Sequence, residues 1–354
     1  MASIWQNLGS RALRSLLILF GVAIIVFVLF DIIPSDPARL MAGRHANSDQ
    51  IALIRNELGL NQSKPIQFLH YINDLSPMSF ESIESQMKHH WKRILTVPIG
   101  NYSFAVKWPY LGKSYVNGSL VSDIILGGFL ETLTLALVSI FIALLLGIPI
   151  GVVSAKNPDG FWDKITRVLT TSGMAIPSFV LAICIGFVFG YLLSDYTGLS
   201  MTGSLFTYDV YSGEEILSLQ HLVLPAITLA VHPFCVVTQL MRNSMVDVLQ
   251  ADYIRTARAK GLSEGKVLYK HALVNAISPV VTASATWLAA LMAGSVFVEY
   301  VFGWNGLGHV IVNAIDYQDF PIIMGLTLFV SLIFVAMSGL LSMIYPLLDP
   351  TLRG

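Results

Sequence analysis

Few residues of this 354-residue chain are spaced for catalysis or for holding a nucleotide. Gly112-Lys113-Ser114 ends like a phosphate-binding loop, but the pattern needs an earlier glycine where Lys107 stands, and no apolar strand precedes it. His89 and His90 are adjacent, so they point in different directions and make a poor metal chelate. We find no paired-carboxylate or Ser-His-Asp signature. The sequence therefore predicts no catalytic residues, no metal ligands and no bound cofactor.

The most informative stretch is polar and basic, runs from Asp252 to Ala276 and lies between two long apolar segments. Ala257 and Ala259 precede Gly261, and a second helical pattern follows that glycine. Small residues allow close backbone approach, and basic side chains pair with acidic rims. This favours a short helix, a bend at Gly261 and an amphipathic return that docks on a partner protein. A plain basic loop near anionic lipid headgroups is the alternative. The residues expected at the contact are Arg255, Thr256, Ala257, Arg258, Ala259, Lys260, Gly261 and Leu262.

The elements that would position this segment are membrane helices. The chain is 55% hydrophobic and only 12% charged, with a mean hydropathy of +0.68, whereas soluble domains are about 25% charged. Cys184 and Cys235 both lie in apolar runs and offer no disulfide framework. The first apolar segment is too long for a signal peptide and lacks a small-residue cleavage site, so we interpret it as a retained span. Six apolar segments are long enough to cross a bilayer; they are Leu13–Ile33, Leu130–Val153, Val168–Leu193, Leu222–Met241, Ala276–Val298 and Pro321–Leu347.

The distribution of basic residues predicts that both chain ends are cytoplasmic. The short loops at about 194–221 and 299–320 contain no Lys or Arg, whereas the other short loops contain many. Residues 34–129 are too long for a simple connection. Within them, residues 48–74 have helical spacing that Lys64-Pro65 breaks into two short helices, and residues 77–108 indicate a small outer subdomain or hairpin. The predicted fold is all-α and polytopic.

Several residues inside the apolar segments suggest function. Pro177-Ser178 and His232-Pro233 are expected to interrupt spans and free backbone carbonyls toward a pathway or a partner helix. His232 is the one ionisable residue well inside a span, which suggests a functional group, although a neutral histidine bonded to a carbonyl is the alternative. Glu131 and Glu299 lie near span ends and are expected at the water interface. The predicted substrate pathway comprises Pro177, Ser178, His232, Thr282 and Ser284.

The polar segment resembles the coupling loop of ABC importer permeases in the peptide/nickel branch, which includes dipeptide and oligopeptide permeases. The family pattern is E-A-A-x-x-x-G, nine residues, then I-x-L-P; Gly261 takes the glycine, and Ala257 and Leu273 also match. DYIRTARAKGL followed by KHALVNA is similar to the peptide-branch version. DIIPSDPA, MAIPSFVLA, VFVEYVFGWNGLGHVIVNAI and YPLLDPTLRG also resemble family landmarks. The departure is an extra outer segment at about 76–108.

The resemblance implies a type I importer fold with three regions: an N-terminal helix at 1–33, an extracytoplasmic segment at 34–122, and a five-helix core at 123–354 with a coupling loop at 243–275. It implies a second homologous permease, two ATPases that bind ATP and Mg²⁺, and an extracytoplasmic substrate-binding protein as partners in a bacterial or archaeal cytoplasmic membrane, with no nucleic acid. Peptide is the expected substrate, and nickel chelates, glutathione and sugars remain open. A membrane enzyme lacks a catalytic constellation. A proton-driven carrier would need carboxylates inside the spans, which the sequence does not indicate.

Overall fold

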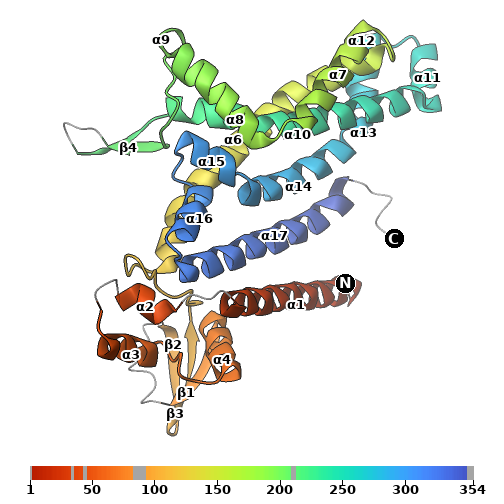
Figure 1. Ribbon diagram of the computed structural model, residues 1–354. Coiled ribbons are helices and arrows are strands. Elements are labelled where there is room, and N and C mark those ends of the chain that lie inside the picture. The colour runs from red at the N-terminus through yellow and green to blue at the C-terminus, as the bar shows by residue number, and fades with distance from the viewer. Residues whose placement is uncertain (1, 33–35, 43–45, 83–92, 209–212, 349–354) are drawn as a thin grey trace. The chain divides into compact units, whose positions relative to one another are not determined.

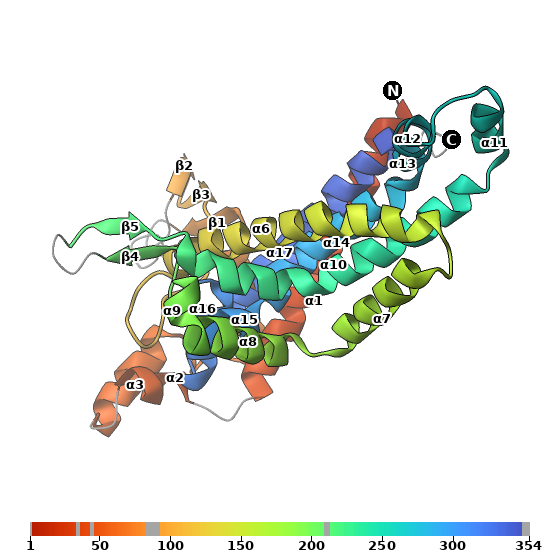
Figure 2. The same ribbon diagram turned by 90° about the horizontal axis from the view of Figure 1, so that it is seen from above.

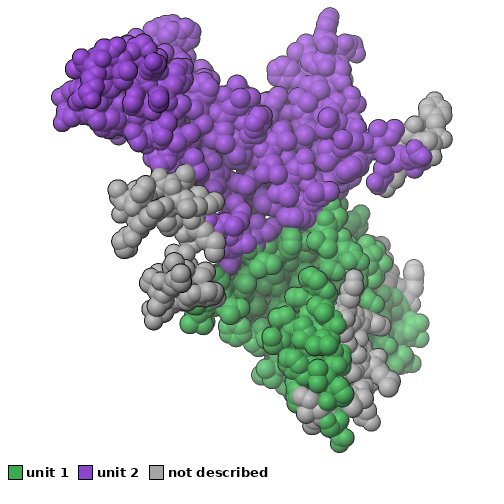
Figure 3. All heavy atoms as spheres, turned by 180° about the vertical axis from the view of Figure 1, so that it is seen from behind, with its two compact units in different colours: residues 1–127, 310–332 green, residues 128–309, 333–354 purple. Residues whose placement is uncertain are grey.

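The structure is a computed structural model that describes residues 2–32, 36–42, 46–82, 93–208 and 213–348. His89 and His90 therefore lie outside the described residues. The fold is mostly helical (Figure 1). The chain divides into two compact units, shown in different colours in Figure 3: unit 1 comprises residues 1–127 and 310–332, and unit 2 comprises residues 128–309 and 333–354. We describe each unit by itself.

Four of the described helices are long and apolar enough to cross a membrane. Two further pairs of helices pass the same test but are bent, by 102° and by 49°, which brings the number of candidate spans to six if each pair is one span. The bent pairs correspond to the third and fifth predicted spans. The four long helices are α1 (Ala2–Ile32), α6 (Val121–Lys156), α10 (Gln220–Leu249) and α17 (Phe320–Leu348).

Unit 1 contains three short helices after α1, namely α2 (Pro37–Ala42), α3 (Ser48–Glu57) and α4 (Lys64–Leu75). The two predicted helices on either side of Lys64-Pro65 are thus present. Asn47 accepts a hydrogen bond from the Gln50 N–H, and the Gln50 side chain accepts one from the Asn47 N–H, so a capping box starts α3. Phe68 of α4 packs edge-on against Phe27 of α1, with ring centroids 5.1 Å apart. Aromatic contact therefore holds α4 along α1.

A three-stranded antiparallel sheet follows α4, in the order β1-β3-β2. Its strands are β1 (Met78–Ser82), β2 (Arg93–Ile99) and β3 (Tyr102–Lys107). Strands β2 and β3 form a hairpin with a two-residue turn at Gly100 and Asn101, where Gly100 has a φ of +65°. A glycine at positive φ suits such a turn. The predicted hairpin is present. Unit 2 holds a second, small sheet of β4 (Phe206–Tyr208) and β5 (Glu215–Leu217), so the fold is mostly helical and not all-α as predicted.

A buried carboxylate fixes the turn that follows β3. Asp319 accepts a hydrogen bond from the Ser114 hydroxyl and another from the Tyr115 N–H at 3.1 Å. Burial raises the pKa of Tyr115 to about 12, and the negative charge of Asp319 adds to this effect. Two segments 204 residues apart in the sequence are thus joined within unit 1.

Unit 2 is a bundle of helices around α10. Its other helical elements are α7 (Phe161–Ala175), α8 (Ser178–Phe187), the π-helix η1 (Val188–Leu192), α9 (Ser194–Thr197), α11 (Asp252–Ala259), α12 (Glu264–Lys266), the π-helix η2 (Val267–Ala272), α13 (Leu273–Ala276), α14 (Ser278–Gly294) and α15 (Val296–Phe302), while α16 (Leu307–Asp316) begins at its boundary. Figures 1 and 2 both show α7 alongside α10.

Small residues bring α6 against α10. A Cβ atom added at Gly151 would lie 2.7 Å from the Met241 Cβ, so only glycine permits this approach. The predicted interruption at His232-Pro233 is wrong, since α10 continues through both Pro225 and Pro233. Membrane helices tolerate such prolines where neighbouring helices surround them, and Pro225 and Pro233 are buried. By contrast, the predicted break at Pro177 is present as the bend between α7 and α8.

Candidate functional site

The segment Asp252–Ala276, called here the central segment, lies at the end of α10 that is remote from α8 (Figures 1 and 2). Helix α10 ends at Leu249, and α11 begins only three positions later, at Asp252. Ala251 caps α11 in an extended conformation without a side-chain hydrogen bond. The short connection means that α11 cannot move far without moving the end of α10.

One face of α11 is anchored in unit 2. Ile254 and Ala257 are buried in an apolar cluster with Met241 and Met245 of α10 and Val267 of η2. Ile254 and Ala257 are three positions apart, so both lie on the same face of the helix. A further tie comes from outside the cluster: Asn275 donates a hydrogen bond to the Tyr253 hydroxyl at 3.1 Å. The central segment is therefore packed against the bundle and is not a loose loop.

The other face of α11 is basic and exposed. Arg255 pairs with Asp252 at 3.3 Å, and Arg258 pairs with Glu264 through Nε at 2.9 Å. All four of these side chains are largely in water, so the pairs contribute little stability. Leu262 is the half-buried member of the predicted contact, and Ala257 is buried. Its exposed members are Arg255, Thr256, Arg258, Ala259, Lys260 and Gly261.

Gly261 ends α11 in a way that requires glycine. Its φ is +76°, in the left-handed region that L-residues rarely adopt. Its N–H donates to the Arg258 carbonyl at 2.9 Å, which closes the turn. No heavy atom lies within 4 Å of the position that a Cβ would take. The predicted bend at Gly261 is thus present, and its outer side is open.

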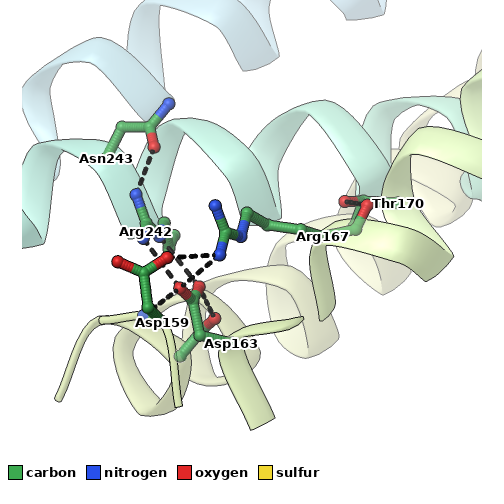
Figure 4. Close-up of polar contacts among 7 residues, drawn as sticks. Asp159, Asp163, Arg167, Thr170, Arg242 and Asn243 are labelled. Carbon is green, nitrogen blue, oxygen red and sulfur yellow. Dashed lines mark hydrogen bonds and ion pairs between the residues drawn. The ribbon is translucent and has the colours of Figure 1, made fainter. Parts of the chain in front are cut away.

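A buried ion pair lies on an adjacent face of α10, where Arg242 follows Met241 (Figure 4). The Asp163 side chain of α7 is 0% exposed and faces Arg242 of α10, which is 17% exposed. Arg242 donates through Nε at 2.9 Å to one carboxylate oxygen and through Nη2 at 2.8 Å to the other. The Ser154 hydroxyl of α6 donates to Asp163 at 2.8 Å, and so does the Asp159 N–H at 2.8 Å. Asp163 therefore joins three helices. It forms a bidentate, charge-assisted ion pair with Arg242 of α10 and accepts a hydrogen bond from Ser154 of α6.

Weaker ties continue along α7 and α10. Gln239 donates to the Thr170 hydroxyl at 3.0 Å. Further along, a Cβ at Gly173 would lie 2.7 Å from the Cys235 sulfur. Arg167 adds an exposed ion pair with Asp159 at 2.6 Å (Figure 4). No local pattern in the sequence indicates these pairings, because the partners lie on different helices and Asp163 and Arg242 are 79 residues apart.

The five predicted pathway residues are dispersed over three helices of unit 2. Pro177 and Ser178 lie at the bend between α7 and α8, and His232 lies half-buried in α10. Thr282 is half-buried in α14, while Ser284 is buried and donates to the Val280 carbonyl of its own helix at 2.7 Å. Within the described residues, no hydrogen bond joins any two of the five, and the carbonyl-bonded alternative for His232 is not observed. Grouping these residues into one pathway stays a prediction.

A second buried carboxylate lies at the other end of α6. Glu299 of α15 is fully buried within the protein, so its side chain does not face water as its position near a span end predicted. It accepts hydrogen bonds from Thr132 at 2.9 Å, from Ser295 at 2.6 Å and from the Gly308 N–H at 2.6 Å. Thr132 in turn accepts one from the Leu307 N–H at 2.8 Å. These bonds hold the turn between α15 and α16 against α6.

Glu131 is also buried within the protein, and it accepts a hydrogen bond from the Leu205 N–H at 3.4 Å. Both carboxylates were expected in water because they lie near span ends, but the chain folds back over those ends. The described residues contain no cluster of three or more histidine, cysteine or acidic side chains that could hold a metal ion.

The architecture is that of a multi-pass membrane protein with a packed, basic segment at one end. Residues 147–354 match the family described as binding-protein-dependent transport system inner membrane component. Residues 4–136 match the family described as the N-terminal part of the membrane component of such systems. The chain therefore belongs to the ABC transporter permeases of the peptide/nickel family. As such it is a multi-pass subunit of a bacterial inner-membrane ABC transporter, a complex with ATPase subunits, and is not itself an enzyme. The resemblance inferred from the sequence is confirmed.

Two curated relatives are glutathione transport system permease proteins GsiC. That of Salmonella choleraesuis (strain SC-B67) is 34% identical over 332 residues, which cover 94% of each chain. That of Escherichia coli (strain K12) is 33% identical over 335 residues, which cover 95% of this chain and 94% of the relative. Among solved structures, an inward-facing form of the MetNI methionine ABC transporter matches with a TM-score of 0.50 and 19% identity, covering 64% of this chain and 97% of that one. That similarity supports the permease fold alone.

Proposed function

We propose that the chain is one of two permease subunits of an ATP-driven importer, and that the central segment docks in a groove of an ATPase subunit. The observation that carries this proposal is the two-sided character of α11. Ile254 and Ala257 fix one face in the bundle, while the basic face and the open side of Gly261 remain accessible. A segment that only connects two spans needs neither the anchor nor the open glycine.

The proposed topology has six spans, with both chain ends in the cytoplasm. It counts each bent pair as one span. On this topology the basic residues of the central segment lie inside and the short loops without Lys or Arg lie outside, as the positive-inside bias requires. Residues 34–122 also lie outside, but their charge does not decide the topology, because long loops translocate largely regardless of charge. Single cysteines at Lys164 and at Asp195, in a background without Cys184 and Cys235, test it. A membrane-impermeant maleimide should label intact cells only at position 195, and the opposite pattern would reverse the topology.

Transport requires that the ATPase bind the central segment differently in its two nucleotide states. A partner that binds both conformations of the permease equally shifts no equilibrium. We infer that ATP-driven closure of the two ATPases draws the central segments of both permeases together and opens the cavity toward the outside, where a binding protein delivers the solute. Because α11 is anchored to α10, motion of the docked face reaches the spans.

The proposed substrates are di- or oligopeptides, including glutathione, which is itself a tripeptide. The two relatives described above are named for glutathione transport, and the family includes peptide permeases. Nickel chelates or another small solute carried by the same machinery are the alternatives. Purifying the assembled complex with its binding protein and identifying the bound solute by mass spectrometry distinguishes them. A bound metal chelate without a peptide would contradict the peptide proposal.

The remaining competitor is a secondary carrier, and the buried Glu131 and Glu299 make it worth a direct test. Uptake of reduced glutathione and of alanyl-alanine should be measured in cells depleted of ATP with the proton gradient intact. We expect uptake to stop, because ATP supplies the energy. Uptake that persists without ATP would contradict the proposed importer and favour the carrier.

A further inference from the structure

We propose that Asp163 and Arg242 are positioning residues that make α7 follow α10 when the central segment is moved. This inference rests on the proposed function, in which an ATPase moves that segment. The ion pair would transmit the movement of α10 to α7 and, through α7, to the rest of unit 2.

The end of α10 has two occupied faces. Met241 and Met245 contact the apolar cluster that holds α11. Arg242, next to Met241 in the sequence, points to α7 and binds Asp163 (Figure 4). The same turn of α10 is therefore attached to the central segment on one face and to α7 on an adjacent face. Any shift of α11 that moves this turn acts directly on the ion pair.

Helices α7 and α10 are antiparallel neighbours over the whole length of α7. Three contacts set this register, and residue numbers rise along α7 as they fall along α10. They are Asp163 with Arg242, Thr170 with Gln239, and Gly173 with Cys235. Only the first is a buried, bidentate ion pair. The second is one hydrogen bond, and the third is close packing without a directional bond, so the ion pair supplies most of the resistance to sliding.

Moving α7 has consequences further along unit 2. At Pro177 the chain turns by 102° into α8, which packs against both α10 and α15. The N-terminal end of α7 is thus tied to the turn that carries α11, and its C-terminal end leads into α8. Asp163 also accepts a hydrogen bond from the Ser154 hydroxyl of α6, so α6 is attached to the same carboxylate. The geometry makes this carboxylate the junction through which α6, α7 and α10 move together.

The test compares ATP hydrolysed per peptide imported by the complete complex in proteoliposomes. The variants are Asp163→Asn, which keeps the shape of the side chain, and Arg242→Lys, which keeps the charge but cannot bind with two nitrogens of a planar group. Lys164→Gln is the matched control, because it removes a charge from the exposed neighbour of Asp163 on the same helix. The probe is alanyl-alanine or reduced glutathione, whichever the wild-type complex imports.

We expect the ATP cost per imported peptide to rise by about fivefold or more in Asp163→Asn, which corresponds to the lower range of coupling between sites. Arg242→Lys should give an intermediate rise, and Lys164→Gln should match the wild type. The thermal midpoint of each complex is measured alongside. If these residues only stabilise the fold, their substitution would lower the amount of active complex but leave the ATP hydrolysed per imported peptide unchanged.

If the Asp163→Asn complex fails to assemble, Gln239→Met is tested in its place. This substitution removes the hydrogen bond from Gln239 of α10 to Thr170 of α7 without leaving a buried charge. It should raise the same ratio by a smaller factor. Assembled variants with a wild-type ratio would overturn the positioning role. A wild-type complex that imports neither probe with ATP would instead contradict the proposed function, so the two failures are distinguishable.

Discussion

Replacing Gly261 by arginine should separate ATP hydrolysis from uptake while the complex stays folded. The magnitude follows from the backbone and the surroundings of this residue. With a φ of +76°, an L-residue at this position costs about 1–2 kcal/mol. No heavy atom of the chain lies within 4 Å of the added Cβ, so no further clash arises within the subunit. This cost is small against the ~5–15 kcal/mol by which folded domains are stable.

The larger effect is expected outside the chain. The long, charged side chain would fill the space where we propose that the ATPase approaches the backbone. Coupling between two sites corresponds to about 5–150-fold, so uptake per ATP should fall within that range. The assay measures ATP hydrolysis and peptide uptake on the same proteoliposomes.

Two control variants separate backbone strain from added bulk. Gly261→Ala introduces the strained φ with minimal bulk and should reduce uptake only modestly. Gly265→Arg adds the same side chain at an exposed glycine that has no positive φ and no neighbour within 4 Å. Gly265 lies within the central segment but outside the predicted contact at residues 255–262, so Gly265→Arg should reduce uptake per ATP much less than Gly261→Arg. Normal uptake per ATP by Gly261→Arg would refute the docking role. An equal loss in Gly265→Arg would show that any added charge disturbs this surface, and that Gly261 has no special position.

Three further predictions concern stability and titration, and each is checked on the purified complex. Glu299→Leu leaves three buried donors without their acceptor and should lower the free energy of unfolding by about 3 kcal/mol or more, whereas Glu299→Gln should cost less, as thermal unfolding would show. Gly151→Val pushes α6 from α10 and should cost about 1–3 kcal/mol, whereas Gly127→Val, with no atom within 4 Å, should be neutral. Asp319→Asn removes the negative charge beside Tyr115, so the pKa of Tyr115 should fall from about 12 but stay above its ordinary value because the residue remains buried. An ultraviolet difference titration, with Tyr115→Phe as the reference, would measure this pKa.

Features that depend on neighbours in the sequence were the most predictable. The helices on either side of Lys64-Pro65 follow from a periodic pattern and a proline, and the bend at Gly261 follows from a glycine after small helix-forming residues. The β-hairpin also had a local signal, because Gly100-Asn101 is a two-residue turn between alternating residues. Composition alone predicts an all-α fold, because the apolar spans dominate the chain and the short strands contribute little to its average.

Buried polar pairs could not be predicted, because their partners are far apart in the sequence. Thr132 and Glu299 are 167 residues apart, and Asp163 and Arg242 are 79 residues apart. Position along a span indicated that Glu299 would face water, but burial depends on the turn between α15 and α16, which packs over it. The predicted break at His232-Pro233 is wrong for a related reason. Proline usually breaks a helix, but a membrane helix tolerates it where neighbouring helices surround it, as they surround α10.

The two buried carboxylate networks of unit 2 are separated along α6 by about the thickness of a membrane. Thr132 and Ser154 lie on α6 and contact Glu299 and Asp163, respectively. Twenty-two residues separate Thr132 from Ser154, which is about 33 Å along a helix at 1.5 Å per residue, close to the ~30 Å thickness of the hydrocarbon core. If α6 crosses the membrane, each network lies near one surface, where a charged group is less costly than at the centre. Close to the second network, three residues before Ser154, α6 packs against α10 at Gly151. Helix α6 is thus held near each end by a hydrogen bond to a buried carboxylate, Glu299 of α15 at one end and Asp163 of α7 at the other, and its contact with α10 at Gly151 adds close packing beside the second network.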